Sequence, residues 1–400
     1  MIRFFYCFTF FCFSLNSLSQ TDSEFFIKAK IAEEYKKTDT AIIFISEALK
    51  LKKTALYYEE RADLYLSMKN VKSALSDYLS ASADGSNEIK YKIARCYSAM
   101  DSLSETITWL TKYLSEKNKI PEIIIRTDSV FKKINETNQW GELWRKNWYD
   151  NYENYIGDIY YLSVNNKFDE IYEVLDSALL HYPDKPELWL WRAKAFSYGN
   201  NPKEAMKSLD NAIKFDPSRV DVLGMRADLL RKTGKSKKAV TDYSSILEIQ
   251  PWNVKYIKER GNAKMEAEDF ANAVSDFLEY YKYDSLDVNS LYMAAKATYL
   301  KTDVNEALKL FSKCIEKNSG KCEYYFERGK CYYDLLDNEK AYSDFCMAID
   351  LRPNVGEYFY YRGLTYYALK NKTGACHDWE KAQSLDYLKA QDYMLRYCAN

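Results

Sequence analysis

From residue 152 onward, the chain repeats a pattern of apolar and polar positions with a period of 34 residues. Within each repeat an apolar or aromatic residue stands fourth, a small residue usually eighth and a bulky residue usually eleventh. Spacings of three, four and seven residues place side chains on one face of a helix. Each repeat is therefore predicted to open with an amphipathic helix. The first residues of the seven repeats are Tyr152, Pro186, Val220, Val254, Val288, Cys322 and Gly356.

The second half of each repeat predicts a second helix. An alanine recurs at the twentieth place, and a bulky residue follows it four positions later, again on one helix face. The alanines are Ala205, Ala239, Ala273, Ala307, Ala341 and Ala375, and the bulky residues are Leu209, Tyr243, Phe277, Phe311, Phe345 and Trp379. Prolines at 183, 217, 251 and 353 stand where a second helix should end.

A 34-residue helix pair with these small and bulky positions resembles the tetratricopeptide repeat (TPR). The resemblance is strong over 152–389 and weaker over three upstream repeats at 22–54, 55–86 and 87–118. It implies an all-α, right-handed α-solenoid of helix-turn-helix repeats with a concave groove that binds partners. Residues 390–400 resemble the capping helix that covers the apolar side of a last repeat. The expected domains are an N-terminal array (20–118), an irregular connector (119–151), a C-terminal array (152–389) and this cap.

The connector contains Trp140, Trp144 and Trp148, spaced four residues apart. This spacing predicts three indole rings on one face of a helix. A ligand platform is one interpretation. Because large aromatic side chains dominate protein cores, we favour buried tryptophans that join the two repeat arrays.

The first 19 residues have the form of a secretory signal peptide: Arg3, an apolar run over residues 4–13, and small residues before Gln20. The run is shorter than the ~20 residues that a membrane-spanning helix needs, and no later segment is apolar enough to span. We therefore expect an exported protein. High Lys, Asn, Ile and Tyr usage, with Gln at the cleavage point, resembles envelope proteins of AT-rich Gram-negative bacteria. This favours the periplasm, the outer-membrane surface or secretion.

After cleavage seven cysteines remain, an odd number that leaves at least one thiol outside intramolecular disulfides. They are Cys96, Cys314, Cys322, Cys331, Cys346, Cys376 and Cys398. Two pairings are considered: Cys331 with Cys346, and the favoured Cys376 with Cys398, which would pin the cap to the last repeat. The chain has only two histidines and no Cys-x-x-Cys spacing, so we expect neither a metal site nor a cofactor.

Composition and motifs argue against several classes of function. The 57 Lys and Arg residues nearly balance the 58 Asp and Glu residues, and no basic cluster suggests nucleic-acid binding. The sequence has no nucleophile elbow, no phosphate-binding glycine loop and no paired-histidine motif. His181 and His377 stand alone among helical positions. We therefore expect a non-enzymatic scaffold, and the sequence leaves its oligomeric state open.

Arginine and aspartate recur at fixed places of the repeats. Arg61, Arg192, Arg226, Arg260, Arg328 and Arg362 precede the small residue, whereas Asp77, Asp242, Asp276, Asp344 and Asp378 precede the bulky residue of the second helix. The two places are 16 residues apart on neighbouring helices. An Arg can hold a carboxylate by two hydrogen bonds, so we expect structural ion pairs within or between repeats.

The TPR resemblance directs attention to places two, five, nine and twelve, which face the groove in that family. Lys258 and Asn262 match a clamp for a terminal carboxylate, but Met293, Glu323 and Glu327 do not. We therefore disfavour a binder of terminal carboxylates.

Instead, the last three repeats offer rings and lysines at these places. The predicted partner-binding residues are Tyr292, Lys296, Tyr299, Phe326, Lys330, Tyr333, Tyr360 and Tyr367. An exposed aromatic patch generally marks an interaction surface, so we expect a protein or peptide partner there, in envelope assembly or protein–protein interaction. Glycan binding is the alternative function. A purely internal packing role for the rings is equally open.

Overall fold

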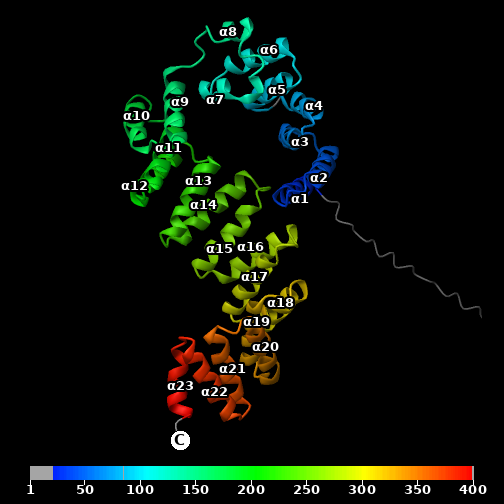
Figure 1. Cartoon of the computed structure of the whole chain (residues 1–400), viewed down its shortest axis with the longest axis vertical. Coiled ribbons are helices and arrows are strands. Elements are labelled where there is room, and N and C mark those ends of the chain that lie inside the picture. The colour runs from blue at the N-terminus through cyan, green and yellow to red at the C-terminus, as the bar shows by residue number, and fades with distance from the viewer. Residues whose placement is uncertain (1–20, 84, 399–400) are drawn as a thin grey trace, which may run out of the picture. The chain divides into compact units, whose positions relative to one another are not determined.

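The computed structural model describes residues 21–83 and 85–398, and its regular elements in these ranges are all helices (Figure 1). The chain divides into two compact units between Ser102 and Leu103. The described part of the first unit contains three helices that open the upstream repeats and two that close them. These are α1 (Asp22–Glu34), α2 (Thr38–Leu51), α3 (Ala55–Ser67), α4 (Val71–Ala81) and α5 (Asn87–Ala99).

The second unit begins with α6 and an irregular segment, and continues as seven helix pairs and a last helix. The first elements are α6 (Leu103–Leu114), α7 (Glu122–Thr127), the 3₁₀ turn η1 (Ser129–Phe131) and α8 (Asn138–Leu143). The pairs are α9 (Asn151–Val164) and α10 (Phe168–His181), α11 (Pro186–Tyr198) and α12 (Pro202–Phe215), α13 (Val220–Lys232) and α14 (Ser236–Ile249), α15 (Lys255–Glu266) and α16 (Phe270–Tyr283), α17 (Val288–Leu300) and α18 (Val304–Lys317), α19 (Cys322–Asp334) and α20 (Asn338–Leu351), α21 (Gly356–Ala368) and α22 (Lys372–Ser384); the last helix is α23 (Lys389–Tyr397).

The helices follow the predicted repeats closely. In the seven-repeat array, α11, α13, α17, α19 and α21 begin at the residue that opens their repeat, and α9 and α15 begin within one residue of it. Each helix packs against its neighbours in the chain, within its pair and onto the next pair. The chain is therefore an all-α solenoid with a C-terminal capping helix, as the sequence predicted.

The unit boundary lies inside the third upstream repeat, whereas the sequence placed the junction of two arrays in 119–151. The reason is that α6 contacts α8, and α7 contacts α9. Helix α6 thereby belongs to the second compact unit rather than to that of α5, its partner in the repeat.

A left-handed residue ends the first helix of each repeat. Asn166, Asn200, Gly234, Glu268 and Thr302, all at the fifteenth place, have φ between 53° and 72°. This conformation lets the following N–H reach a carbonyl five residues back, as in the bond from Asn201 N to Phe196 O at 2.8 Å. The chain then reverses within a short turn, and the second helix packs antiparallel to the first.

The small residue at the eighth place makes room for the ring at the twenty-fourth. A Cβ added to Gly329 would lie 2.7 Å from the Phe345 ring, and one added to Gly363 would lie 2.6 Å from Trp379. Both rings are buried. Close approach of the two helices therefore explains why bulky residues are absent from this place in these repeats.

The predicted Arg–Asp pairs form, and they join the two helices of one repeat. Two of the three guanidinium nitrogens of Arg328, Nε and Nη2, donate to the Asp344 carboxylate at 2.8 Å. The same two-bond geometry links Arg61 to Asp77, Arg226 to Asp242, Arg260 to Asp276 and Arg362 to Asp378. Each carboxylate is buried, so the fork compensates its lost hydration.

The expectation of three tryptophans on one helix face is wrong. Helix α8 ends at Leu143, with Trp144 at its C-cap, and Trp148 lies beyond the helix. The Trp148 indole donates to the Leu143 carbonyl at 2.7 Å, which satisfies an acceptor that the ended helix leaves open. Trp140 is buried and its ring centroid lies 5.7 Å from that of Trp144.

The predicted signal peptide lies outside the described residues. None of the helices described in the structure is long and apolar enough to cross a membrane.

We predict that Arg328→Met lowers the free energy of unfolding by about 3 kcal/mol, because it leaves the buried Asp344 carboxylate without its guanidinium. Urea unfolding followed by circular dichroism measures the change. The double variant Arg328→Met/Asp344→Leu should regain most of the loss, since no charge then remains buried.

The exposed pair of Lys309 with Glu306 provides the control. Lys309→Met should leave the unfolding free energy nearly unchanged, because water screens this pair. Equal losses in Arg328→Met and Lys309→Met would contradict a special role for the buried fork.

Candidate functional site

The ring and lysine residues predicted to bind a partner lie on the first helices of the last three repeats. Helix α17 carries Tyr292, Lys296 and Tyr299, helix α19 carries Phe326, Lys330 and Tyr333, and helix α21 carries Tyr360 and Tyr367. The sequence predicted one contiguous exposed surface. The structure separates the rings into two groups with different surroundings.

The rings at the fifth place pack into the junction with the following repeat. The Tyr292 centroid lies 5.1 Å from that of Tyr324 in the next repeat, and 6.0 Å from that of Phe311 in its own. Phe326 repeats the arrangement, with its centroid 4.6 Å from that of Tyr358. These rings join successive repeats.

For Phe326 and Tyr360 the structure therefore favours the internal packing role that the sequence left open. Phe326 is 5% exposed and Tyr360 is 8% exposed. A tyrosine at the third place of the following repeat covers Phe326. Tyr360, in the last repeat, is instead covered by Tyr387 and by Tyr393 of the cap.

The rings at the twelfth place are more accessible. Tyr299 and Tyr333 are half-buried, and Tyr367 is 43% exposed. Burial and a 2.7 Å hydrogen bond to the Asp334 carboxylate raise the pKa of Tyr299, so this phenol stays protonated at neutral pH. The Lys330 ammonium lies 5.1 Å from the Tyr299 ring centroid.

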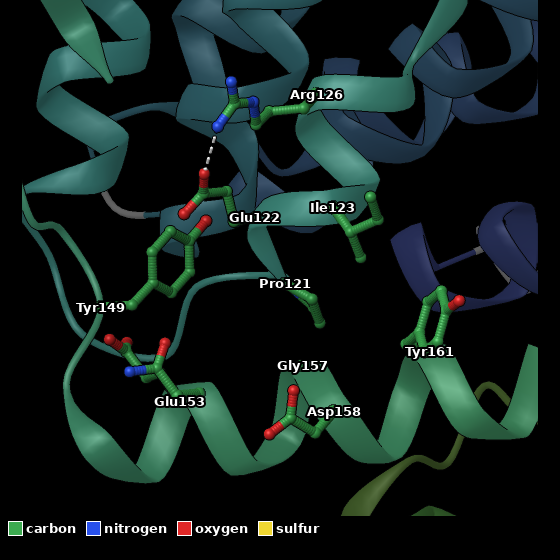
Figure 2. A pocket seen from close by; sticks show the side chains of 10 residues that line it. Pro121, Glu122, Ile123, Arg126, Tyr149, Glu153, Gly157, Asp158 and Tyr161 are labelled. Carbon is green, nitrogen blue, oxygen red and sulfur yellow. Dashed lines mark hydrogen bonds and ion pairs between the residues drawn. The ribbon is translucent and has the colours of Figure 1, made fainter. Parts of the chain in front are cut away.

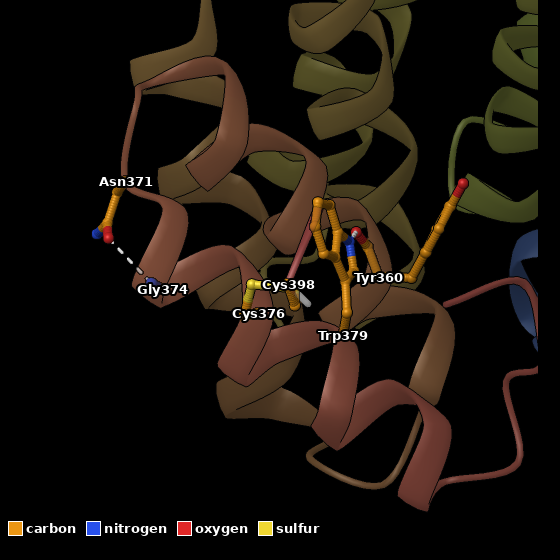
Figure 3. The surroundings of a disulfide bond; sticks show 6 residues. All are labelled: Tyr360, Asn371, Gly374, Cys376, Trp379 and Cys398. Carbon is orange, nitrogen blue, oxygen red and sulfur yellow. Dashed lines mark hydrogen bonds between the residues drawn. A yellow bond between two sulfur atoms is a disulfide. The ribbon is translucent and has the colours of Figure 1, made fainter. Parts of the chain in front are cut away.

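The cap is held by a disulfide between Cys376 on α22 and Cys398 after α23 (Figure 3). This is the pair favoured from the sequence. Cys331 and Cys346, the other pair considered, are free thiols. Beneath the cap, Trp379 is fully buried and its indole N–H donates to the Tyr360 carbonyl at 3.3 Å. The cap thus seals the last repeat with aromatic contacts and a covalent bond.

A hollow of about 480 Å³ opens on the first helices of the first two repeats of this array. We call it the inner hollow. Its apolar lining includes Ile156, Tyr160, Pro186 and Trp191. We call places two, five, nine and twelve of a repeat the groove places, because the predicted C-terminal rings and lysines were expected to face a groove from there. The inner hollow is lined from the same places: the second by Glu153 and Glu187, the fifth by Ile156 and the ninth by Tyr160.

Charged side chains of both signs surround the inner hollow, and most are already paired. Lys119 and Glu153, with only 4% and 7% of their side chains exposed, form an ion pair of 2.7 Å. Arg219 pairs with Glu187. Lys185 lies with its ammonium 5.4 Å from the Tyr152 ring centroid. Because the Lys185 ammonium has a cation–π partner but no ion pair among the described residues, it is the cation best able to meet an incoming group.

The indole nitrogen of Trp191 is buried and has no hydrogen-bond partner among the described residues. A buried donor without an acceptor is costly and uncommon. Trp191 is one of the residues that line the inner hollow. Because this nitrogen is covered, it does not present a donor to the hollow.

Sequence reasoning overlooked the inner hollow although its signal was present. Glu153, Ile156 and Tyr160 occupy groove places, but these residues differ in chemical type, whereas the C-terminal groove places repeat aromatic rings and lysines. The contribution of Lys119 and Pro121 could not be read from the repeat, because they come from the irregular segment. Within the described ranges, no cluster of His, Cys, Asp or Glu could hold a metal ion.

We predict that Tyr360→Ala lowers the free energy of unfolding by about 3 kcal/mol, because it opens a cavity beneath the cap. Tyr367→Ala should cost much less, since that ring is partly in water. Thermal and urea unfolding of both variants measure the difference. Equal costs would show that the fifth and twelfth places do not differ in packing.

Comparison with known proteins gives likeness only among solved structures. No family model matches the chain, and no curated protein matches it. The C-terminal part of a TPR repeat-containing protein from Cytophaga hutchinsonii aligns with 18% identity and a TM-score of 0.48, over 58% of this chain and 97% of that one. A tetratricopeptide repeat protein from Parabacteroides merdae aligns with 21% identity and a TM-score of 0.41, over 59% and 93%.

A third solved structure, YrrB, is described as a TPR protein with an unusual peptide-binding site. It has 20% identity and a TM-score of 0.39, and the alignment covers 47% of this chain and 98% of that one. These likenesses concern the fold alone. The 34-residue period and the antiparallel helix pairs of this chain make it a solenoid of tetratricopeptide-like repeats.

Proposed function

We propose that the protein is an exported, non-enzymatic scaffold that binds a peptide segment of a partner protein in the inner hollow. The observation that carries this proposal is the hollow itself, formed at groove places of two successive repeats and lined by aromatic and paired charged residues. Export is supported by the signal-like residues 1–19.

The lining suits an extended peptide. Tyr160 and Ile156 offer an apolar floor, and Lys185 can meet a carboxylate. Side chains that fill the apolar floor would then set the preference among peptides.

The C-terminal groove places extend this proposal. Tyr299, Tyr333 and Tyr367, with Lys296 and Lys330, form a second candidate contact surface on α17, α19 and α21. Tyrosine is favoured at binding hot spots because it presents a large, amphipathic ring. Tyr292, Phe326 and Tyr360 would support this surface from beneath through their packing.

Selection of displayed unstructured peptides on residues 20–400 tests the inner hollow. We expect the selected peptides to bind Tyr160→Ala at least about tenfold more weakly, because this variant removes part of the floor. Tyr198→Ala is the matched control, since Tyr198 is 65% exposed and does not line the hollow. Melting temperatures establish that both variants remain folded.

Equal binding by Tyr160→Ala and the unaltered chain would contradict a site in the inner hollow. A parallel screen of oligosaccharides separates the two functions. A saccharide that raises the melting temperature of the unaltered chain but not of Tyr160→Ala, with no peptide selected, would favour glycan binding instead.

A further inference from the structure

The arginine at the seventh place of a repeat also reaches the preceding repeat. Arg226 donates to Asp210 on α12 at 2.9 Å, and Arg192 pairs with Asp176 on α10 at 3.0 Å. In other repeats the same guanidinium nitrogen meets a serine hydroxyl, as Arg260 meets Ser244 at 3.4 Å. The second helix of one repeat therefore carries an acceptor that faces the arginine of the next.

Helix α9 reverses this charge. Its seventh place holds Asp158, and the twenty-third place of its repeat holds Val174 rather than aspartate. Asp158 is exposed and has no ion pair among the described residues. The first repeat of the array thus presents a carboxylate at the position where its neighbours present a guanidinium.

The outer face of α9, where a preceding repeat would pack, is hollowed. A cavity of about 670 Å³ is lined by Asp158, Tyr161 and Gly157 of α9, and by Pro121 and Ile123 on the facing segment. In Figure 2, Asp158 and Tyr161 rise from α9 toward Pro121 and Ile123. A smaller hollow of about 240 Å³, lined by Asp158, His181 and Tyr182 among others, lies toward α10. We call the two together the α9 trough.

The trough combines apolar surface with one unpaired charge. Tyr161 is 54% exposed and Ile123 is 42% exposed. Glu122 is paired with Arg126 at 2.8 Å, and Glu153 is paired with Lys119. Asp158 is the carboxylate that these cations leave available. The six-residue α7 of the irregular segment contacts α9 here, and it is much shorter than the second helix of a repeat.

We propose that the α9 trough docks a helix of a partner protein that places a lysine or arginine against Asp158 and apolar side chains against Tyr161 and Ile123. A helix is the expected occupant because a second helix fills the corresponding position at the later junctions, as α12 does against α13. A basic residue is expected because the charge of the facing residue is inverted from Arg226 to Asp158. The α9 trough adjoins the inner hollow, and Pro121 and Glu153 line both. The contacts proposed here use Asp158, Tyr161 and Ile123, which do not line the inner hollow, so neither proposal requires the other.

Selection of a displayed library of 18-residue amphipathic helices on residues 20–400 tests the proposal. We expect enriched helices to carry a Lys or Arg within the apolar face, and to bind Asp158→Arg at least tenfold more weakly. Replacing that basic residue by Asp in the peptide should restore binding to Asp158→Arg. Such a reciprocal exchange separates direct pairing from a general change in the protein.

Two controls keep the outcome specific. Glu173→Arg makes the same charge change at an exposed position of α10 outside the trough, and Tyr160→Ala alters the inner hollow; both should bind the helices as before. Failure to enrich any helix, or binding that Asp158→Arg leaves intact, would overturn the proposal. Self-association of the chain that Asp158→Arg abolishes would assign the trough to a second copy and would also overturn it.

Discussion

The fork between arginine and aspartate is the interaction that fixes the two helices together in the repeats of Arg61, Arg226, Arg260, Arg328 and Arg362. Its two hydrogen bonds fix the first helix of a repeat against the second, and a further nitrogen of the same guanidinium reaches the preceding repeat. A buried aspartate such as Asp242 would be costly without it. A planar group with five donors can make these contacts together, whereas an ammonium cannot match the fork. The apolar stack is therefore held in register by a polar element.

Much of the fold could be predicted because the same residue types recur at the same places of many repeats. The alanine at the twentieth place and the ring at the twenty-fourth indicate one helix face, and the recurrence of Arg and Asp 16 residues apart indicates a contact between helices. The first residues of α11, α13 and α21 agree with the predicted starts. Segments outside the period were less predictable. The spacing of Trp140, Trp144 and Trp148 predicted one helix that carries all three. The observed helix α8 ends at Leu143, before Trp148.

The candidate site was harder to predict because exposure at one place depends on the following repeat. Phe326 is covered by Tyr358, which stands at the third place of the next repeat, and Tyr360 is covered by residues of the cap. A groove place therefore gives the direction of a side chain but not what lies over it. The inner hollow raises the same difficulty, since Lys119 and Pro121 come from a segment without the repeat. Burial in a solenoid is a property of junctions rather than of single repeats.

The same dependence explains why the two ends of the seven-repeat array differ. At the C-terminal end, Tyr393 of α23 and the Cys376–Cys398 disulfide complete the last junction. At the other end, the short α7 contacts α9 where a second helix stands at later junctions, and α9 retains an exposed carboxylate at Asp158. A solenoid must cover or use the face of each terminal repeat, because that face would otherwise expose apolar surface. The aromatic cap closes the C-terminal end of the array. The hollowed face of α9, with its free carboxylate, is consistent with a first repeat that accepts a partner.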